Sequence, residues 1–574
     1  MNTISMLWVL LDFDQRKRAI LLLILMFFGM VLEALSLGLI IPVLGILANP
    51  NDAVNYMFVE RFFKVDSINA INLFIGMMIL LVTLYFFKVF FLAFLSWYQA
   101  RFVFDIESRL SSQLYSGYLQ QSYMFHMQHN SALLVRNVIT SVGQLAASVM
   151  SGSILLTELF ILVGVLGLLI LIEPIGAIAV TGIIFLFGFA YHRLTRQHIS
   201  SWGRARQYHE GQRLKSLQQG FGGVREIKLS GQECSLIADY ENHNLANAHV
   251  GKCQAVITAL PRLWLELLFL IAIFCLIIAM IGQGRSLAEI IPILGVFVAA
   301  AFRLMPSANK IINAIQNLNF NLPVIHELYK EKALFDKSKV FFLKKKECDY
   351  LKFNKEISVE NVSFIYPDQI NPILTNISFK IRKGEMIGFM GVSGSGKSTL
   401  INLLLGLLEP TSGRVLVDGI KISDHLSTWY KMIGYVPQNV FLLDDTLIRN
   451  IAFGLPDSEI NEIDINNALK EAQLLDFVDS LPDGLETKVG ERGVRLSGGQ
   501  AQRIGIARAL YHKTQVLVFD EATSALDAET EMAIISTISS LSKDRTILII
   551  THRLSTVVSC NKIYKVTANG LILT

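Results

Sequence analysis

The residues with the clearest chemistry form a glycine-rich loop in the second half of the chain. The loop reads Gly391-Val392-Ser393-Gly394-Ser395-Gly396-Lys397-Ser398-Thr399, between the apolar runs 386–390 and 400–405. A strand, such a loop and a helix together turn backbone N–H groups toward a phosphate, and the helix N-terminus adds positive potential. Lys397 can then reach the β- and γ-phosphates, and Ser398 can bind Mg²⁺. The loop predicts a nucleoside triphosphate site, with a chance glycine turn as the alternative.

Two carboxylates that end a later apolar strand could complete the chemistry of phosphoryl transfer. The strand 516–519 is followed by Asp520 and Glu521. Asp520 suits Mg²⁺ binding, directly or through water, and Glu521 could polarise an attacking water as general base. The sequence Leu-Ser-Gly-Gly-Gln at 496–500 lies between the loop and this strand. Tyr366 precedes the loop and could stack on an adenine, although an aromatic residue before a proline is more often part of a core.

The order of these motifs resembles the nucleotide-binding domain of ATP-binding cassette (ABC) transporters. Tyr366 looks like the adenine-stacking residue, and Gly391 to Ser398 looks like the Walker A loop. Gln438, in Val-Pro-Gln, is similar to the Q-loop glutamine, and Leu496 to Gln500 matches the family signature. Together these matches make a chance glycine turn negligible.

The remaining motifs of the family follow in the same order. Asp520 and Glu521 match Walker B, 524–527 matches the D-loop, and His552 matches the switch histidine. The resemblance implies an enzyme that hydrolyses ATP with Mg²⁺, with catalytic roles for Glu521, His552 and Gln438. The residues that it implies for Mg²⁺ are Ser398, Gln438 and Asp520. Those that it implies for the nucleotide are Tyr366, Gly391, Ser393, Gly394, Gly396, Lys397, Ser398, Thr399, Ser497, Gly498, Gly499, Gln500 and Asp520.

The resemblance also implies a dimer. In ABC proteins the signature serine and glycine, here Ser497 and Gly499, contact the γ-phosphate held by the Walker A loop of the opposite subunit. One chain carries one copy of each motif, and both copies are intact. A homodimer is therefore the simplest expected assembly.

Composition places a membrane domain before the nucleotide-binding part. The chain has 574 residues, of which 52% are hydrophobic, and the mean hydropathy is +0.47. The apolar excess lies before residue 318, and the net charge of +4 gives no case for nucleic-acid binding. The five cysteines are scattered without metal-ligand spacing, so they are expected to be reduced.

Six apolar segments are long enough to be candidate membrane spans. They are 19–48, 71–98, 149–172, 176–191, 256–282 and 289–309. Basic residues crowd the segments that this count places inside, so both termini are expected to be cytoplasmic. Pro174 suits the start of the fourth span.

The loops between the spans differ in character. The polar segments 101–138 and 193–252 are predicted to be cytosolic extensions of the helices, and by resemblance to ABC exporters they carry coupling helices, with 222–228 as a candidate. The outer segment 54–65 has apolar residues at helical spacing. It predicts an amphipathic helix, lying either at the outer membrane surface or against neighbouring protein.

The whole layout resembles half of an ABC exporter. The implied fold class is a multidomain membrane protein, with an all-α six-helix transmembrane domain and an α/β P-loop ABC nucleotide-binding domain. We expect the first domain over 1–325, a linker over 326–354 and the second domain over 355–574.

Three basic residues lie inside predicted spans, where charge is costly and therefore informative. Counted at about 1.5 Å per residue from the outer end, Lys88 and Arg262 lie roughly 30 Å deep and Arg303 roughly 20 Å deep. In a dimer they would surround a cavity suited to an anionic head group. Lys88 and Arg262 could instead reach inner-leaflet phosphates. Glu33 and Glu266 are the predicted ion-pair partners.

The predicted cargo comes from a second resemblance. Segments 259–266 and 302–310 are similar to those of bacterial lipid-linked oligosaccharide flippases, in which basic residues hold the pyrophosphate. Lys88 stands where that family has arginine. We therefore predict an ATP-driven flippase that moves a polyprenyl-pyrophosphate oligosaccharide to the outer leaflet of a bacterial inner membrane. The alternative is an exporter of drugs or of other lipids, such as a lipid A precursor.

Overall fold

The computed structural model describes most of the chain, and the described residues form two compact units. These residues are 3–40, 43, 70–172, 174–282, 287–344, 351–367, 369–392, 394–490, 493–522, 528–541, 545–553, 557–567 and 570–573. Met1–Gln121 and Gln128–Ser338 belong to a helical unit, and Ser122–Met127 and Lys339–Thr574 belong to an α/β unit. The short segment 122–127 therefore groups with the unit that follows it much later in the chain.

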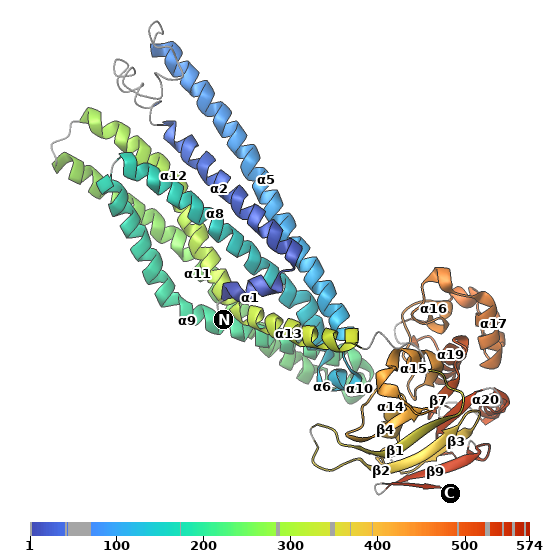
Figure 1. The fold of residues 1–574 in the computed structure, drawn as a ribbon. Coiled ribbons are helices and arrows are strands. Elements are labelled where there is room, and N and C mark those ends of the chain that lie inside the picture. Colours follow the sequence, from blue (N-terminus) through green and yellow to red (C-terminus); the bar gives the residue numbers. More distant parts are fainter. Residues whose placement is uncertain are drawn as a thin grey trace. The chain divides into compact units, whose positions relative to one another are not determined.

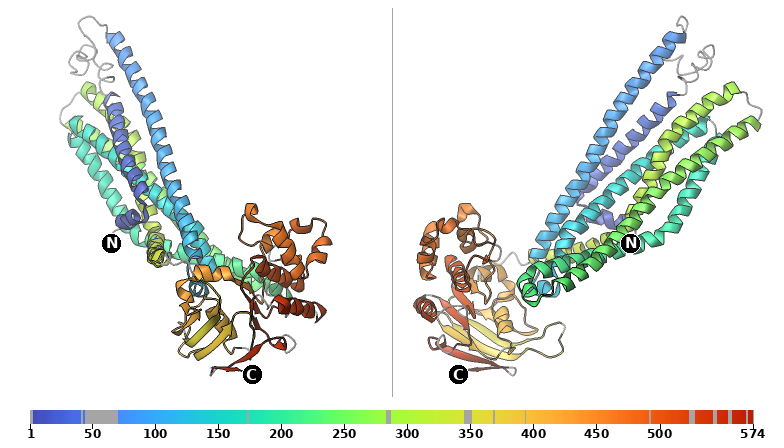
Figure 2. Two further views of the ribbon diagram at one scale, coloured as in Figure 1. Left: turned by 45° about the vertical axis from the view of Figure 1, so that its right-hand side comes forward. Right: turned by 180° about the vertical axis from the view of Figure 1, so that it is seen from behind.

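Six long helices dominate the described part of the helical unit and run alongside one another (Figure 1; Figure 2). They are α2 (Phe13–Gly38), α5 (Ala70–Leu119), α8 (Val142–Ile172), α9 (Pro174–Gly222), α11 (Glu233–Gly282) and α12 (Leu287–Phe320). Among the described residues, four stretches are long and apolar enough to cross a membrane: Phe13–Gly38, Phe74–Leu119, Ser131–Leu171 and Glu233–Gly282. The other two predicted spans lie within α9 and α12, and α9 begins at Pro174 as predicted.

The longest helices exceed the thickness of a membrane. α5 and α11 have 50 residues each, and α9 has 49. At about 1.5 Å per residue such a helix is roughly 75 Å long, whereas the hydrocarbon core of a bilayer is about 30 Å thick. The polar halves of these helices must therefore extend beyond the hydrocarbon.

Apolar side chains fill the space between the long helices. Met26 of α2, Val165 of α8 and Phe297 of α12 are fully buried. Because lipid is as apolar as these side chains, the helices gain from close packing rather than from removing apolar surface from water. A charged side chain buried within this apolar packing is costly and therefore informative.

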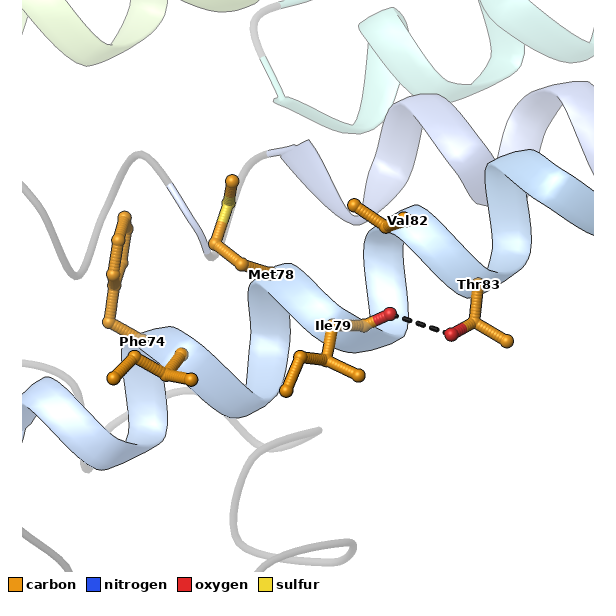
Figure 3. Close-up of a pocket in the computed structure, with 6 residues that line it drawn as sticks. Phe74, Met78, Ile79, Val82 and Thr83 are labelled. Carbon is orange, nitrogen blue, oxygen red and sulfur yellow. Dashed lines mark hydrogen bonds between the residues drawn. The ribbon is translucent and has the colours of Figure 1, made fainter.

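The N-terminal part of α5 presents a shallow apolar groove of about 380 Å³ (Figure 3). Its lining residues are Phe74, Ile75, Met78, Ile79, Val82 and Thr83. The hydroxyl of Thr83 donates a 2.8 Å hydrogen bond to the carbonyl of Ile79. The hydrogen of the one polar side chain in the groove is therefore already bonded within the helix. Such a face suits contact with hydrocarbon.

Short helices connect the long ones in the polar region. α10 (Val224–Ser230) lies between α9 and α11 and overlaps the candidate coupling segment 222–228. α6 (Tyr123–Gln128) follows α5, and its Met124 packs against the core of the α/β unit. α13 (Leu322–Lys344) occupies much of the region predicted as a linker. The predicted amphipathic helix 54–65 lies outside the described residues.

The central sheet of the α/β unit has the strand order β10-β9-β3-β8-β7-β6. Its strands are β3 (Met386–Met390), β6 (Ile433–Val436), β7 (Val516–Asp520), β8 (Thr546–Ile550), β9 (Lys562–Thr567) and β10 (Gly570–Leu573). β9, β3, β8, β7 and β6 are parallel, and only β10 pairs antiparallel in this sheet. The central strands are short and almost wholly buried apolar runs, as expected for parallel strands that are covered on both faces.

A second, antiparallel sheet with the order β2-β1-β4-β5 shares one core with the central sheet. Its strands are β1 (Glu356–Phe364), β2 (Leu374–Arg382), β4 (Ser412–Val417) and β5 (Ile420–Lys421). A second core is formed by residues of the central sheet and of the helices over 447–451, 462–471 and 498–511. Besides α6 and the end of α13, the described part of the unit contains α14 (Lys397–Leu404), α15 (Leu426–Met432), α16 (Leu447–Ile451), α17 (Glu462–Glu471), α18 (Leu475–Asp479), α19 (Gly498–Tyr511) and α20 (Ala528–Leu541).

Candidate functional site

Strand topology gathers the predicted catalytic motifs at one edge of the central sheet. The glycine loop follows β3, and His552 follows β8. Asp520 ends β7 and Glu521 comes directly after it, while Gln438 follows β6. These four strands are neighbours and parallel, so their carboxyl ends meet at the same edge. In open α/β sheets this edge is where ligands bind.

The phosphate loop is held in a shape that needs glycine at two positions. Gly396 has φ +93°, in the left-handed region, and an added Cβ would lie 2.9 Å from the side chain of Leu374. A Cβ at Gly391 would lie 2.6 Å from the carbonyl oxygen of Val566. The loop therefore passes too close to its neighbours for a side chain at either position.

The polar groups of the loop fit a bound triphosphate. The buried ammonium of Lys397 donates to the carbonyls of Gly391 and Val392 at 2.9 and 3.0 Å, so it lies beneath the loop. The hydroxyl of Ser395 is buried and has no hydrogen-bond partner among the residues that the structure describes. Ser398 is exposed in the first turn of α14, where a hydroxyl can meet a metal ion or a phosphate. Ser393 lies outside the described residues.

Tyr366 lies beside the phosphate loop. Its hydroxyl is 3.3 Å from that of Thr399, and its ring meets Phe364 edge to face with centroids 4.9 Å apart. The aromatic residue and the loop are therefore neighbours, as adenine stacking would require.

Glu521 lies at the centre of the predicted catalytic group. One carboxylate oxygen accepts a 2.9 Å hydrogen bond from Nε2 of Gln438, and the other is 2.6 Å from Nε2 of His552. Glu521 also has φ +50°, an uncommon conformation for a side-chain-bearing residue, and its N–H donates to the carbonyl of Ile550. Strained backbone of this kind is concentrated at functional sites. Of the three residues that the resemblance implied to be catalytic, Gln438 and His552 thus both contact Glu521.

Asp520 is partly buried. Its carboxylate accepts a 3.3 Å hydrogen bond from the hydroxyl of Tyr435. Burial raises the pKa of Asp520 and is the main influence; the Tyr435 hydrogen bond and the Lys397 ammonium oppose it, whereas the Glu521 carboxylate adds to it. A bound divalent cation would favour the ionised carboxylate, so this environment suits a metal site.

The signature motif begins a helix. Ser497 caps α19, its hydroxyl accepting from the N–H of Gln500 at 3.2 Å while the Gln500 side chain accepts from the N–H of Ser497 at 2.8 Å. Gly498 and Gly499 form the first turn of this 14-residue helix. The D-loop residues 524–527 lie outside the described residues.

A cluster of charged side chains, the membrane ion cluster, joins four helices of the helical unit. It consists of Glu33 on α2, Lys88 on α5, Glu158 on α8, and Arg303 and Lys310 on α12. Glu33 accepts a 3.0 Å hydrogen bond from Lys88 and forms an ion pair with Arg303, whose Nε lies 2.6 Å away, and Glu158 pairs with Lys310 (2.7 Å). Two hydroxyls complete the cluster, Ser36 with Lys88 at 3.0 Å and Ser307 with Glu158 at 2.6 Å.

The three predicted cargo residues are not equally accessible. The side chain of Lys88 is 10% exposed and that of Arg303 is 22% exposed. Arg262 is 73% exposed and pairs with Glu266 on its own helix at 3.0 Å. The predicted ion-pair roles of Glu33 and Glu266 are confirmed, but the structure brings only Lys88 and Arg303 together.

Comparison with known proteins gives the family. The profile of the ABC transporter family matches residues 374–524. An ATP-dependent lipid A-core flippase of Ralstonia nicotianae is 31% identical over 465 residues, which cover 79% of this chain and 76% of that protein. The chain belongs to the ABC transporter family.

Two further relatives match this transporter over a shorter region. An ATP-dependent lipid A-core flippase of Photobacterium profundum is 46% identical over 220 residues, 38% of this chain and 37% of that protein. A protein of Staphylococcus aureus named for multidrug export is 47% identical over 218 residues, again 38% and 37% of the two chains. These two alignments thus span little more than a third of each relative.

A solved structure supports the fold over nearly the full length. It is that of a bacterial Atm1-family ABC exporter with ATP bound, with a TM-score of 0.79 and 23% sequence identity, and the match covers 98% of this chain and 95% of that chain. The predicted fold class is confirmed: a helical membrane domain precedes an α/β ABC nucleotide-binding domain. The transporter is a multi-pass membrane protein and an ATP-driven ABC exporter half.

Sequence reasoning missed part of the membrane ion cluster. Glu158 lies in a strongly apolar stretch, and a carboxylate inside a predicted span was itself a signal. Lys310 lies one position after the end of the predicted sixth span, so the prediction placed it outside the membrane-spanning segment. Tyr435 was also missed, because nothing in the sequence shows that its hydroxyl faces Asp520.

Proposed function

We propose that this transporter is a homodimeric exporter that uses ATP to move a lipid with a phosphate-bearing head group across a bacterial inner membrane, with both termini in the cytoplasm. The observation that carries the proposal is the Ralstonia relative, whose similarity extends through most of the membrane half and whose name specifies a lipid A-core cargo. The charged side chains of the membrane helices support a polar, anionic head group rather than a wholly apolar cargo.

The names of the relatives favour the lipid or drug alternative over the oligosaccharide cargo predicted from the sequence. Lipid A-core molecules and polyprenyl-pyrophosphate glycans share phosphate groups and sugars, so the same cations could serve either. Arg262 is the exposed candidate for direct contact with the head group, and Arg303 is partly exposed. Lys88, which is buried against Glu33, would act by holding that carboxylate.

In the ATP site, each group has a role that its geometry supports. Glu521 would accept the proton of the water that attacks the γ-phosphorus, while the bond to the β-phosphate oxygen breaks and ADP leaves. Gln438 and His552 would hold the Glu521 carboxylate toward that water. Lys397, the glycine-loop N–H groups and Ser395 would bind the triphosphate.

The other assignments follow the resemblance. Mg²⁺ would neutralise charge on the phosphates, and Ser398, Gln438 and Asp520 are the residues that would hold it. Tyr366 would stack on the adenine, and Thr399 would help to keep the ring in place. Ser497, Gly498, Gly499 and Gln500 would meet the nucleotide of the other subunit.

The homodimer predicts an ATP-dependent cross-link between two copies of the chain. Ser393→Cys and Ser497→Cys are introduced together with Glu521→Gln, after the native cysteines are replaced. Because ATP would bring the signature of one subunit to the Walker A loop of the other, the disulfide-linked dimer should increase at least about tenfold with ATP.

The cross-link is read on a denaturing gel without reductant. A matched control pairs Ser497→Cys with Glu409→Cys, since Glu409 follows the C-terminal end of α14, the helix that begins at the phosphate loop, and its side chain is 66% exposed. A chain that stays monomeric with ATP, although it binds ATP, would contradict the homodimer and favour pairing with a different half-transporter.

The cargo is tested by ATP-dependent translocation of fluorescent lipids in proteoliposomes. A lipid A-type glycolipid, a polyprenyl-pyrophosphate oligosaccharide and an uncharged amphipathic drug are compared. We expect transport of a phosphate-bearing lipid, and a loss of about tenfold in Arg262→Gln, which corresponds to the loss of one charged contact of about 1.4 kcal/mol. The matched control is Arg414→Gln, an exposed arginine of the α/β unit that pairs with Glu360.

The three cargoes separate the alternatives. Transport of the glycolipid but not of the oligosaccharide would select the lipid A-type cargo, and the reverse result would restore the cargo predicted from the sequence. Transport of the uncharged drug alone, with no effect of Arg262→Gln, would overturn the anionic cargo.

A further inference from the structure

We propose that Tyr435 is a positioning residue for Mg²⁺: its hydroxyl fixes the carboxylate of Asp520 so that one oxygen faces the metal. The proposal rests on the metal-binding role proposed above for Asp520, and it does not depend on the cargo. The hydrogen bond from the Tyr435 hydroxyl to Oδ2 of Asp520 is 3.3 Å long and leaves Oδ1 for a cation or its water. Carboxylates that bind metal ions are commonly oriented by such hydrogen bonds.

Strand register explains why these two side chains meet. β6 and β7 are parallel neighbours, and Tyr435 is paired with Val518. Side chains two residues apart on a strand share a face, so Asp520 lies on the same face of the sheet as Val518 and Tyr435. A residue one position earlier or later on β6 would point to the opposite face.

The neighbours of Tyr435 hold it in this position. On the opposite face, a Cβ at Gly434 would lie 2.7 Å from the carbonyl oxygen of Ala509, so β6 is pressed against α19 there. The ring of Tyr435 packs against the core that includes Leu400 and Ile401 of α14, the helix that begins at Lys397. The ring of Tyr435 is thus held by this core, and its hydroxyl is hydrogen-bonded to Asp520.

The position of Tyr435 along the chain adds a second link to the site. Gln438 follows three residues later and donates to Glu521, which in turn follows Asp520. The short segment from Tyr435 to Gln438 therefore contacts both carboxylates at the end of β7. A loss of the Tyr435 contact should act on the metal through Asp520 alone, whereas Gln438 contacts Glu521 and is also one of the residues proposed above to hold the metal.

Tyr435→Phe tests the proposal because it removes one hydroxyl and keeps the ring that packs in the core. The probe is Mn²⁺ in place of Mg²⁺, with a non-hydrolysable ATP analogue, and free Mn²⁺ is measured by electron paramagnetic resonance. We expect the affinity for Mn²⁺ to fall about tenfold, the lower end of the range for residues that orient metal ligands. Binding of the analogue in the presence of a chelator should stay within about twofold.

Two further variants make the result decisive. Tyr430→Phe removes a hydroxyl that donates to the carbonyl of Gly406 at 3.0 Å in the same unit, and it should bind Mn²⁺ as the wild type does. Asp520→Asn should lose more Mn²⁺ affinity than Tyr435→Phe. ATP hydrolysis by Tyr435→Phe should recover at high Mg²⁺, because a positioning defect raises the metal requirement rather than removing the base.

Each outcome separates this proposal from the function on which it rests. Normal Mn²⁺ affinity in Tyr435→Phe, with a loss in Asp520→Asn, would overturn the role of Tyr435 and leave the metal role of Asp520 intact. Normal Mn²⁺ affinity in both variants would overturn both roles. An equal loss in Tyr430→Phe and Tyr435→Phe would assign the effect to general destabilisation and overturn the proposal.

Discussion

Glu521→Gln is expected to lower the rate of ATP hydrolysis by about 10²- to 10⁴-fold, the contribution typical of a positioned general base. The amide has the size of the carboxylate and can still contact Gln438 and His552, but it cannot accept the proton of the attacking water. Because the phosphate loop is untouched, ATP should bind with little change. The substitution should therefore trap ATP in the transporter and stop transport.

Two measurements test whether Glu521 is the general base. Hydrolysis is measured in a single turnover in lipid nanodiscs, and ATP binding is measured by calorimetry on the same sample. The matched control is Glu360→Gln, which removes the charge of an exposed glutamate that pairs with Arg414 on the other sheet. Hydrolysis within about threefold of the wild-type rate would contradict the proposed base. His552, whose Nε2 lies 2.6 Å from Glu521, would then be the next candidate.

The ATP site could be predicted largely from the sequence because its chemistry depends on local motifs. The glycine loop, the carboxylates after an apolar strand and the signature glycines each specify a short structure by themselves. Parallel strand order then brings them to one edge of the sheet. The contact between Tyr435 and Asp520 could not be predicted in this way, because it depends on the register between two strands that are 80 residues apart in the chain.

The membrane half was predicted more coarsely. The lengths of the apolar segments predicted the long helices, because the thickness of the bilayer sets the length of a helix that spans it. The pairing of charges did not follow, because it depends on which faces of four helices meet. The sequence predicts Lys88 and Arg303 around a cavity, with Glu33 and Glu266 as ion-pair partners of the basic residues, but not which cation meets which carboxylate. In the structure both cations bind the same carboxylate, which lowers the charge that they can offer a head group.

Glu33→Gln is expected to destabilise the helical unit by about 3–5 kcal/mol, the usual cost of breaking a buried ion pair by removing one partner. Glu33 is 1% exposed and contacts both Lys88 and Arg303, so its neutralisation leaves two cations short of a counter-charge between packed helices. Unfolding in detergent, followed by circular dichroism as denaturant is added, measures the loss. The matched control is Glu266→Gln, a glutamate inside a predicted span whose side chain is 50% exposed; it should cost about 1 kcal/mol or less.

The double variant Glu33→Gln/Lys88→Met tests whether this cost arises from unpaired charge. It removes one negative and one positive charge, so Arg303 keeps Glu158, 3.9 Å away, as its remaining partner. If the cost is electrostatic, the double variant should recover much of the lost stability, since buried pairs can be replaced together at little cost. A double variant as unstable as Glu33→Gln would contradict that explanation and point to packing. If it is stable and also transports lipid at the wild-type rate, Lys88 serves the structure, and the head group must be held by Arg262 and Arg303.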